Sequence, residues 1–231
     1  MRPLAVDIDG TLTDDRRVVD PRVLPVLAEW EESAPVVLAT GKALPYPVAL
    51  CEFAGIAVRV VAENGGLSAL ADDDSLVRHG DREAARRVVE RYREAGHPAD
   101  WTGLDLVNRW RETEVAVPAE GPVAALREFA AEEGMQVFDT GFAYHVTSPE
   151  VDKGVALRAA ADRLGVPVER FVAVGDSEND AGMLRAAGES YAVANADEAA
   201  MAAADVVTEG SFADGFLEAV ERAAGEPATE R

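Results

Sequence analysis

Two aspartates, Asp7 and Asp9, end the first apolar run of the chain in the stretch AVDIDGTLT at residues 5–13. Burying a carboxylate is unfavourable unless it is paired, hydrogen-bonded or bound to a metal ion. A spacing of two places both side chains on the same side of an extended backbone, with Ile8 turned toward the core. The pair therefore requires a cation, and one carboxylate can act as a nucleophile while the other transfers a proton.

Polar residues also follow the other apolar runs that read as strands. After the second run come Thr40, Gly41 and Lys42, and after the run at 171–175 come Asp176, Asn179 and Asp180. Lys153 and Gly154 are added to this set because they begin the helix that follows the middle part of the chain. Because parallel strands present their carboxyl ends at one edge of a sheet, we expect these side chains to meet there. Carboxylates that converge raise each other's pKa unless a divalent cation lies among them, and oxygen-only ligands favour Mg²⁺. A lysine and a hydroxyl beside Mg²⁺ describe a site for a phosphoryl group.

The elements that must position these residues alternate between strand and helix. Apolar runs without a period-two pattern predict buried parallel strands at residues 3–8, 35–40, 58–62, 171–175, 191–195 and 205–208. A helix with Asp20 as its N-cap is expected to run through Trp30, and a second is interrupted early by Pro45 and Pro47. The helices after residue 152 are expected at residues 153–164, near residues 180–187, as a short alanine-rich helix after residue 195, and after residue 208, with a tail after residue 225 that is expected to fray. This alternation predicts an α/β fold with a doubly wound, Rossmann-like parallel sheet.

The middle of the chain has a different order of elements. It predicts helices at residues 81–95 and 122–133 and extended segments at 104–107, 112–117, 136–140 and 142–147. This α-β-β-α-β-β order suggests a small α+β domain, residues 78–151, inserted into a core formed by residues 1–77 and 152–231. An insertion at the strand ends could close over a ligand, and we expect it to set substrate specificity.

The chain carries an unusually large negative charge. Asp and Glu number 43 against 22 Lys and Arg, for a formal net charge of −21. Only Lys42 and Lys153 are lysines, so the other basic residues are arginines. Such a composition is typical of halophilic archaeal proteins and makes nucleic acid and anionic membranes poor candidate partners. Where lysine is nearly absent, the two that remain are candidates for function.

We expect the protein to need high salt for stability. Self-repulsion at this net charge opposes compaction in dilute buffer, but at about 1 M salt the Debye length falls to roughly 3 Å and the repulsion is screened. The melting temperature measured by calorimetry should therefore rise between dilute buffer and molar salt. An equal or higher melting temperature in dilute buffer would contradict this expectation.

The remaining composition favours a protein of the reducing cytoplasm. The single cysteine, Cys51, permits no internal disulfide and reads as a small core residue. No apolar run approaches the roughly 18 residues of a membrane span, and no secretory signal precedes the first expected strand. We therefore expect a small phosphorylated metabolite as the partner of a monomer or homodimer.

Four motifs together resemble those of the haloacid-dehalogenase-like phosphohydrolases. They are DIDGT at 7–11, the threonine of VLATG at 37–41, VDKG at 151–154 and GDSEND at 175–180, in this order. The ENGG at 63–66 resembles the segment that precedes the large α+β cap in one class of that superfamily. The stretches VDIDGTLTD, NRWRETEVA and GDSENDAGML are most similar to those of archaeal phosphoglycolate phosphatases, and the resemblance covers essentially the whole chain.

The resemblance implies roles for the acidic residues. Asp7 would be the nucleophile and a Mg²⁺ ligand, and Asp9 would be the general acid/base that binds the metal through its backbone carbonyl. Asp176 would bind Mg²⁺, and Asp180 would bind it directly or through water. The reaction implied is the Mg²⁺-dependent hydrolysis of 2-phosphoglycolate to glycolate and phosphate through an aspartyl phosphate.

The resemblance also implies a phosphate site. Thr40, together with Gly41, and Lys153 would hold the phosphoryl oxygens, and Asn179 would orient that group. Two alternatives remain open, a sugar-phosphate phosphatase on the same scaffold and a non-catalytic module that binds a phosphorylated metabolite. A haloacid dehalogenase is disfavoured because its chemistry has no use for several aspartates around a metal.

Side chains in the insertion are candidates for substrate contact. Arg109 and Arg111 flank Trp110 and are expected on one face of a strand, where a guanidinium suits a substrate carboxylate. The histidines show no metal-ligand spacing, and His145 is expected to be structural, although it could face the cleft.

Overall fold

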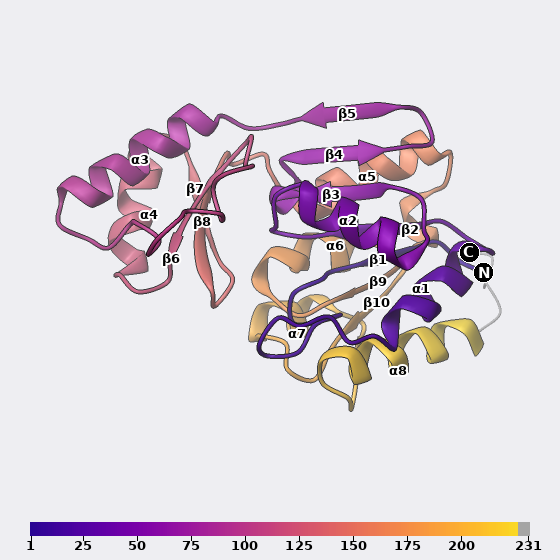
Figure 1. Cartoon of the computed structure of the whole chain (residues 1–231). Helices are drawn as coiled ribbons and strands as arrows, with labels where there is room; N and C mark the ends of the chain where they lie inside the picture. Colours follow the sequence, from indigo (N-terminus) through magenta and orange to yellow (C-terminus); the bar gives the residue numbers. More distant parts are fainter. Residues whose placement is uncertain (226–231) are drawn as a thin grey trace.

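The computed structural model describes residues 1–225, which form two β-sheets (Figure 1); the tail after residue 225, expected to fray, lies outside this range. The larger sheet has the strand order β11-β10-β9-β1-β2-β3-β4-β5. These strands are β1 (Leu4–Val6), β2 (Val36–Ala39), β3 (Arg59–Ala62), β4 (Leu67–Leu70), β5 (Ser75–Arg78), β9 (Val172–Gly175), β10 (Glu189–Ala192) and β11 (Val206–Val207). Every pairing from β11 to β3 is parallel, whereas β4 and β5 add an antiparallel hairpin. The predicted doubly wound α/β core is therefore confirmed.

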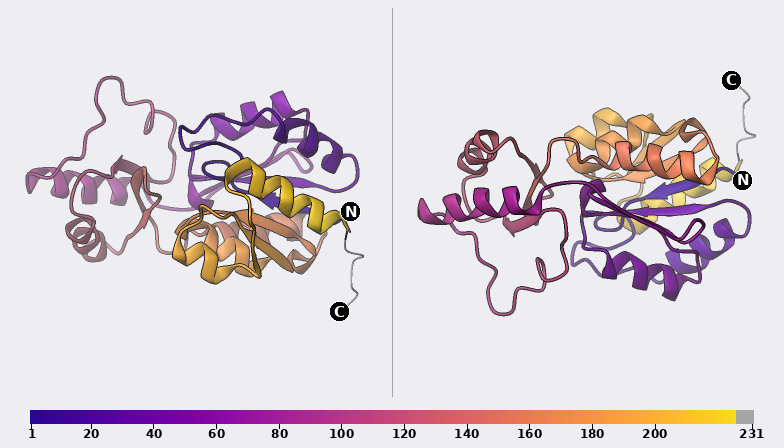
Figure 2. Two further views of the ribbon diagram at one scale, coloured as in Figure 1. Left: turned by 90° about the horizontal axis from the view of Figure 1, so that it is seen from below. Right: turned by 90° about the horizontal axis from the view of Figure 1, so that it is seen from above.

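Helices cover both faces of this sheet, as the two views in Figure 2 show. One face is covered by α1 (Val23–Glu31), α2 (Pro45–Ala54) and α8 (Phe212–Gly225), and the other by α5 (Lys153–Leu164), α6 (Ala181–Ala186) and α7 (Glu198–Ala203). In β1, Leu4 and Val6 enter the first hydrophobic core and Ala5 enters the second. The strand therefore has no polar face, and polar residues are confined to its ends.

A smaller unit, called the cap unit below, extends from α3 to β8 and lies beside the core (Figure 1). It consists of α3 (Arg82–Glu94), β6 (Val115–Pro118), α4 (Val123–Glu132), β7 (Gln136–Asp139) and β8 (Ala143–Thr147). Its antiparallel sheet has the order β6-β8-β7 and shares a hydrophobic core with the two helices. We retain residues 78–151 as the proposed extent of the inserted domain, although Arg78 is the last residue of β5 and pairs with Leu67 of the core sheet.

The hairpin of β4 and β5 is absent from the sequence-based expectation. Both strands are four residues long, and in β5 half-buried residues alternate with exposed ones. They extend the sheet from β3, which supplies the backbone partners of β4. Short edge strands of mixed polarity are stabilised by such neighbours more than by their own propensity, so the local sequence indicates them poorly.

The predicted strand at residues 104–107 is wrong, because the chain between α3 and β6 is irregular. The side chain of Asn108 lies along the outer edge of β6 instead. Its amide donates to the backbone carbonyl of Ala116 at 2.8 Å and accepts from the backbone N–H of the same residue at 2.8 Å. These two bonds satisfy the edge as a further strand would, so the cap sheet has three strands rather than four.

Two helix starts also differ from expectation. Asp20 accepts a hydrogen bond from the backbone N–H of Arg22 at 2.9 Å, and Arg22 itself is the N-cap of α1. Pro45 and Pro47 lie in the first turn of α2 and do not interrupt it. A proline is tolerated in this turn because the N–H groups there have no partner within the helix.

Candidate active site

The predicted site residues lie at the carboxyl ends of three neighbouring strands. In the sheet, β1 lies between β9 and β2. Asp7 follows β1 and donates its backbone N–H to Val174 of β9 at 3.0 Å. Asp176 follows β9 and Thr40 follows β2. The sheet thus brings together residues that are far apart in the sequence.

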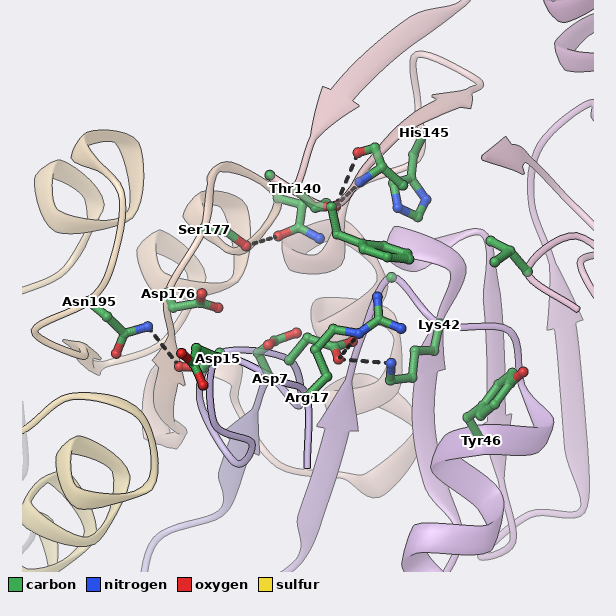
Figure 3. A pocket seen from close by; sticks show the side chains of 18 of the residues that line it. Asp7, Asp15, Arg17, Lys42, Tyr46, Thr140, His145, Asp176, Ser177 and Asn195 are labelled. Carbon is green, nitrogen blue, oxygen red and sulfur yellow. Dashed lines mark hydrogen bonds and ion pairs between the residues drawn. The ribbon is translucent and has the colours of Figure 1, made fainter. Parts of the chain in front are cut away.

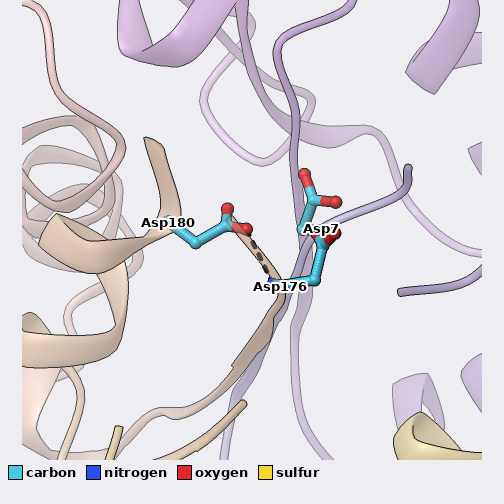
Figure 4. Close-up of side chains that lie close together, drawn as sticks. All are labelled: Asp7, Asp176 and Asp180. Carbon is cyan, nitrogen blue, oxygen red and sulfur yellow. Dashed lines mark hydrogen bonds between the residues drawn. The ribbon is translucent and has the colours of Figure 1, made fainter. Parts of the chain in front are cut away.

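Three carboxylates form a cluster at this edge. Asp7, Asp176 and Asp180 each offer an oxygen within 4.8 Å of the other two (Figure 4). Asp7 and Asp180 are buried, and Asp180 also accepts from the backbone N–H groups of Asp176 at 3.0 Å and Ser177 at 3.1 Å. Gly10 allows the loop after β1 to approach, since a Cβ at this position of φ +81° would lie 2.2 Å from Asp176 Oδ2.

Lys153 lies within the same cluster and is completely buried. Its Nζ donates to Asp7 Oδ1 at 2.7 Å and to Asp180 Oδ1 at 2.6 Å. It is the first residue of α5, which Asp152 caps by accepting from the backbone N–H groups of the next turn. A Cβ at Gly154 would lie 2.2 Å from the carbonyl oxygen of Gly182, so this glycine permits the close approach of α5 and α6.

One lysine does not neutralise this cluster. Burial, reinforced by the charge of Asp180, raises the pKa of Asp7 to about 8. Burial and the charge of Asp7 raise the pKa of Asp176 to about 9. Burial alone would lower the pKa of Lys153, but the charges of Asp180 and Asp7 raise it, so the lysine stays charged.

The chemistry of the cluster fits a hard divalent cation. Asp7 Oδ2 is buried and has no hydrogen-bond partner within residues 1–225. The available donors are carboxylate oxygens, which suit Mg²⁺. Asp7, Asp176 and Asp180 are therefore the residues that would hold the metal.

The electrostatics predict that added Mg²⁺ stabilises the fold more at high pH. The raised pKa values of Asp7 and Asp176 lie above the ordinary value of 3.8, so the metal-free folded state binds more protons than the unfolded state. Its stability should therefore fall as the pH rises toward 9, where both groups ionise. Calorimetry with EDTA or Mg²⁺ should give a larger gain in melting temperature at about pH 9 than at about pH 6. An equal gain at both pH values would contradict this account of the cluster.

Asp9 lies outside the three-carboxylate cluster and lines a cavity. Its Oδ1 is 2.8 Å from Lys42 Nζ and 3.9 Å from Arg17 Nε. The side chain is thus placed for proton transfer to a ligand in the cavity. Metal binding by Asp9 was expected through its backbone carbonyl and stays a proposal.

The predicted phosphate-binding residues lie beside the cluster but are linked to other groups. Thr40 is buried, and its Oγ1 accepts from the backbone N–H of Lys42 at 3.0 Å. Asn179 donates through Nδ2 to Asn64 Oδ1 at 2.7 Å and accepts from Ser177 Oγ at 2.7 Å. A Cβ at Gly41 would lie 3.0 Å from Asn64 Oδ1, so a larger residue would press on this network.

Asn64 and Glu63 are functional candidates without an assigned role in the sequence-based expectation. Both are fully buried in left-handed backbone conformations, with φ of 59° and 50°. Glu63 accepts from the backbone N–H groups of Glu112 and Thr113 at 2.9 and 2.8 Å, and Asn64 donates to Glu114 at 2.8 Å. The two residues therefore join the core to the cap unit. The sequence signal was the ENGG stretch at 63–66, which resembles the segment before a cap and contains a glycine pair that indicates a tight turn.

A cavity of about 440 Å³ separates the aspartates from the cap unit (Figure 3). Asp7, Asp9 and Asp176 line it from the core, and Phe142 and His145 line it from the cap unit. The guanidinium carbon of Arg17 lies 3.6 Å from the centre of the Phe142 ring. This cation–π contact bridges the two units across the cavity, so the structure represents a closed arrangement.

The side chains singled out in the insertion differ in position. Arg111 is buried and lines this cavity, whereas Arg109 lines a separate groove on the cap unit. The expectation that both share one face of a strand is wrong, because both precede β6 in an irregular segment. His145 does face the cavity.

Cys51 has no catalytic environment. It is a residue of α2 whose side chain is buried in the core, and burial raises its pKa to about 11. Its expected role as a small core residue agrees with this position.

The comparisons place this fold and site in a known family. The family model for the haloacid dehalogenase-like hydrolases matches residues 4–107 and 123–220. A Haloarcula marismortui protein named phosphoglycolate phosphatase is 56% identical over 94% of this chain and 95% of its own length. One of the same name from Archaeoglobus fulgidus is 36% identical over 95% and 96%. The chain belongs to the haloacid dehalogenase-like hydrolases, which confirms the expected family and an enzyme of the hydrolase class.

Solved structures agree with this assignment. A crystal structure of a Thermoplasma acidophilum protein has a TM-score of 0.83 at 26% identity, covering 96% of this chain and 97% of that chain. A haloacid dehalogenase-like hydrolase from B. subtilis has a TM-score of 0.77 at 21% identity, covering 96% and 99%. The second likeness supports the fold alone.

The sources of the relatives can be compared with the acidic composition of this chain. Relatives at 56% and 54% identity come from the halophilic archaea Haloarcula marismortui and Halobacterium salinarum, in line with the acidic composition. No helix within the described residues is long and apolar enough to cross a membrane.

Proposed function

We propose that this chain is a Mg²⁺-dependent phosphatase that hydrolyses 2-phosphoglycolate to glycolate and phosphate. The observation that carries the proposal is the cluster of Asp7, Lys153, Asp176 and Asp180 at the edge of the sheet, in which Asp7 Oδ2 has no partner within the described chain. The substrate is taken from the relatives named phosphoglycolate phosphatase, which this chain matches over nearly its full length.

In the first half of the proposed reaction, Asp7 Oδ2 attacks phosphorus and the bond from phosphorus to the ester oxygen breaks. The departing oxygen takes a proton from Asp9, which releases glycolate and leaves an aspartyl phosphate. Lys153 and the hydroxyl of Thr40 would hold the phosphoryl oxygens, with Asn179 orienting them. Mg²⁺, when bound, would neutralise charge that builds on those oxygens.

In the second half, Asp9 takes a proton from water, which attacks the phosphorus of the aspartyl phosphate. The bond to Asp7 breaks, and inorganic phosphate leaves with both aspartates restored. The ion pair with Lys42 keeps the Asp9 side chain directed into the cavity between these steps. The cap unit would limit access of bulk water to the intermediate.

The test is a set of hydrolysis assays in molar salt with Mg²⁺. We expect turnover of p-nitrophenyl phosphate, loss of turnover in EDTA, and the highest kcat/KM for 2-phosphoglycolate in a panel of phosphorylated metabolites. A higher kcat/KM for sugar phosphates would favour the sugar-phosphate phosphatase. Absence of hydrolysis with every divalent metal would favour the non-catalytic binding module.

The same proposal extends to the setting of the enzyme. We propose that it acts in the cytoplasm as a monomer or homodimer on a small diffusible substrate, without nucleic acid or membrane partners. The formal net charge of −21 supports the exclusion of polyanions. Sedimentation in molar salt would separate the monomer from the dimer.

A further inference from the structure

Opposite the aspartates, three buried side chains of the cap unit form an ionic cluster. Glu114 is completely buried and lies immediately before β6. Its Oε1 is 2.8 Å from Nδ1 of His145, and it also accepts a hydrogen bond from Nη1 of Arg111. The cluster has one anionic and two basic members at the wall of the cavity.

Glu114 is held as a carboxylate by these neighbours. Burial alone would raise its pKa, but the charges of His145 and Arg111 and the hydrogen bonds from His145 and Asn64 hold it below the ordinary value. Its second oxygen accepts from Asn64 Nδ2 at 2.8 Å. Both carboxylate oxygens are therefore used inside the protein, so Glu114 orients its neighbours and is not positioned to bind a ligand.

Two of the three guanidinium nitrogens of Arg111 are hydrogen-bonded within the described chain. Its Nε donates to the carbonyl of Val107 at 3.0 Å, and its Nη1 donates to the carbonyl of Gly41 at 2.8 Å as well as to Glu114. Within residues 1–225 no hydrogen bond uses Nη2. Because Arg111 lines the cavity, this nitrogen is the donor that remains for a ligand.

His145 resembles Arg111, because only one of its two ring nitrogens has a partner within the described chain. Its Nδ1 faces Glu114, while the described part of the chain provides no partner for Nε2. The imidazole extends from β8 toward the cavity (Figure 3). Arg111 and His145 therefore each present one unused nitrogen, and Glu114 connects the two side chains.

The other basic groups of the cavity are already engaged. Lys42 pairs with Asp9 at 2.8 Å, and Arg17 lies 3.9 Å from Asp9 and stacks on Phe142. Binding a ligand through either residue would compete with its contact to Asp9. The Arg111 and His145 pair is free of this conflict.

The position of Arg111 also limits the length of a ligand. Its guanidinium contacts the carbonyl of Gly41, the residue after Thr40 in the proposed phosphate site. A phosphate held by Thr40 therefore places the next few atoms of the substrate close to Arg111. A carboxylate separated from the ester oxygen by one methylene group suits this arrangement, and its planar oxygens suit a guanidinium.

We propose that Arg111 and His145, positioned by Glu114, form a carboxylate-binding subsite that selects short phosphomonoesters bearing a second anionic group. This inference rests on the proposed function, because it assumes that the phosphate end lies at the aspartate cluster. Through this subsite, the cap unit would make the enzyme prefer a phosphate ester that carries a carboxylate over one of the same size without a carboxylate.

The test compares two ligands that cannot be hydrolysed, so it does not depend on turnover. Phosphonopropionate carries a CH₂ group in place of the ester oxygen of phosphoglycolate, and propylphosphonate has a methyl group in place of the carboxylate. Their Kd values are measured by calorimetry with Mg²⁺ in molar salt. We expect wild type to prefer phosphonopropionate by about 100-fold, from two hydrogen bonds to a charged group.

The variants Arg111→Gln and His145→Gln should each reduce this preference by about 10-fold, because each loses one hydrogen bond to the carboxylate. His145→Gln retains a donor for Glu114, so it decides the question if Arg111→Gln does not fold. Arg109→Gln is the matched control, since Arg109 belongs to the same segment but faces another groove, and its preference should equal that of wild type. A purely structural role would weaken both ligands together and leave their ratio unchanged.

The outcomes separate this inference from the proposed function. If wild type binds both phosphonates equally and still hydrolyses p-nitrophenyl phosphate, the subsite is wrong and the phosphatase stands. An unchanged preference in both folded variants also overturns the subsite. If neither phosphonate binds and no ester is hydrolysed, the phosphate site itself is wrong and both proposals fail.

Discussion

Replacing Asp7 with asparagine should abolish phosphatase turnover, with kcat reduced by at least about 10⁴-fold. The substitution keeps the shape of the side chain but removes the nucleophilic oxygen, which is the atom without a hydrogen-bond partner in residues 1–225. Asp180 is not free to replace it, because Asp180 is bound to Lys153 and to two backbone N–H groups. The measurement is steady-state hydrolysis of p-nitrophenyl phosphate with Mg²⁺ in molar salt.

The same substitution should stabilise the metal-free fold at high pH. In wild type, Asp7 has a pKa of about 8 when folded against an ordinary value of 3.8, so folding becomes less favourable as the pH rises through this window. Asparagine does not titrate and removes this effect. With EDTA at about pH 9, the variant should melt at a higher temperature than wild type. A lower melting temperature would show that the Lys153 contact outweighs the burial of the charge.

Asp9→Asn serves as the comparison for Asp7→Asn. It removes proton transfer but leaves the nucleophile and the three-carboxylate cluster in place. We expect kcat to fall by roughly 10²-fold, with a covalent phosphoenzyme still detectable by mass spectrometry after rapid quenching. Normal turnover of Asp7→Asn, or a phosphoenzyme in that variant, would overturn the assignment of the nucleophile.

Replacing Lys153 with methionine should destabilise the fold by about 3–5 kcal/mol and eliminate activity. Lys153 is fully buried between Asp7 and Asp180, at 2.7 and 2.6 Å. Methionine approximately fills its volume, so the loss comes from leaving buried carboxylates without their cation. Urea unfolding in molar salt measures the change in the free energy of unfolding.

The dependence of this loss on pH and metal identifies its cause. The deficit should grow from about pH 6 to about pH 9, because Asp7 and Asp176 lose their protons in this interval. Added Mg²⁺ should recover part of the stability, since it supplies positive charge to the same carboxylates. A deficit independent of both pH and Mg²⁺ would indicate a packing effect.

Lys42→Met is the matched control, because Lys42 is the other lysine of the chain. It forms one ion pair with Asp9 at the cavity wall and is partly exposed. We expect its free energy of unfolding to change by less than about 1 kcal/mol. A loss equal to that of Lys153→Met would mean that any lysine near the site has the same effect, against the proposed role of burial.

Much of the core could be predicted because its signals are local. The strand β1 lies within the predicted residues 3–8 and has no polar residue, although it ends directly before Asp7, two residues earlier than predicted. The helix α5 spans Lys153–Leu164 as predicted, with Asp152 as its cap. A hydrophobic run or a capping residue acts within a few positions of its own element, so one sequence is sufficient to recognise it.

The cap unit was predicted less well because its contacts are long-range. Asn108 replaces a strand at the edge of β6 by bonding to Ala116, and no local pattern distinguishes this from a fourth strand. The segment that contains Arg109 and Arg111 is irregular, so the alternation of a strand does not apply to it. Its conformation depends on contacts with the core, including the bond from Arg111 to Gly41.

The order and types of the motif residues were determined by the sequence alone, because each follows a strand or begins a helix that its own neighbours specify. Only the tertiary structure decided which of their polar atoms remain free. It pairs Asp9 with Lys42, joins Asn179 to Asn64, and leaves one oxygen of Asp7 without a partner in the described chain. The physical reason is that a hydrogen bond or ion pair depends on distances between segments far apart in the chain, and these distances are set by the strand order of the core sheet, which brings the loops after β9, β1, β2 and β3 together.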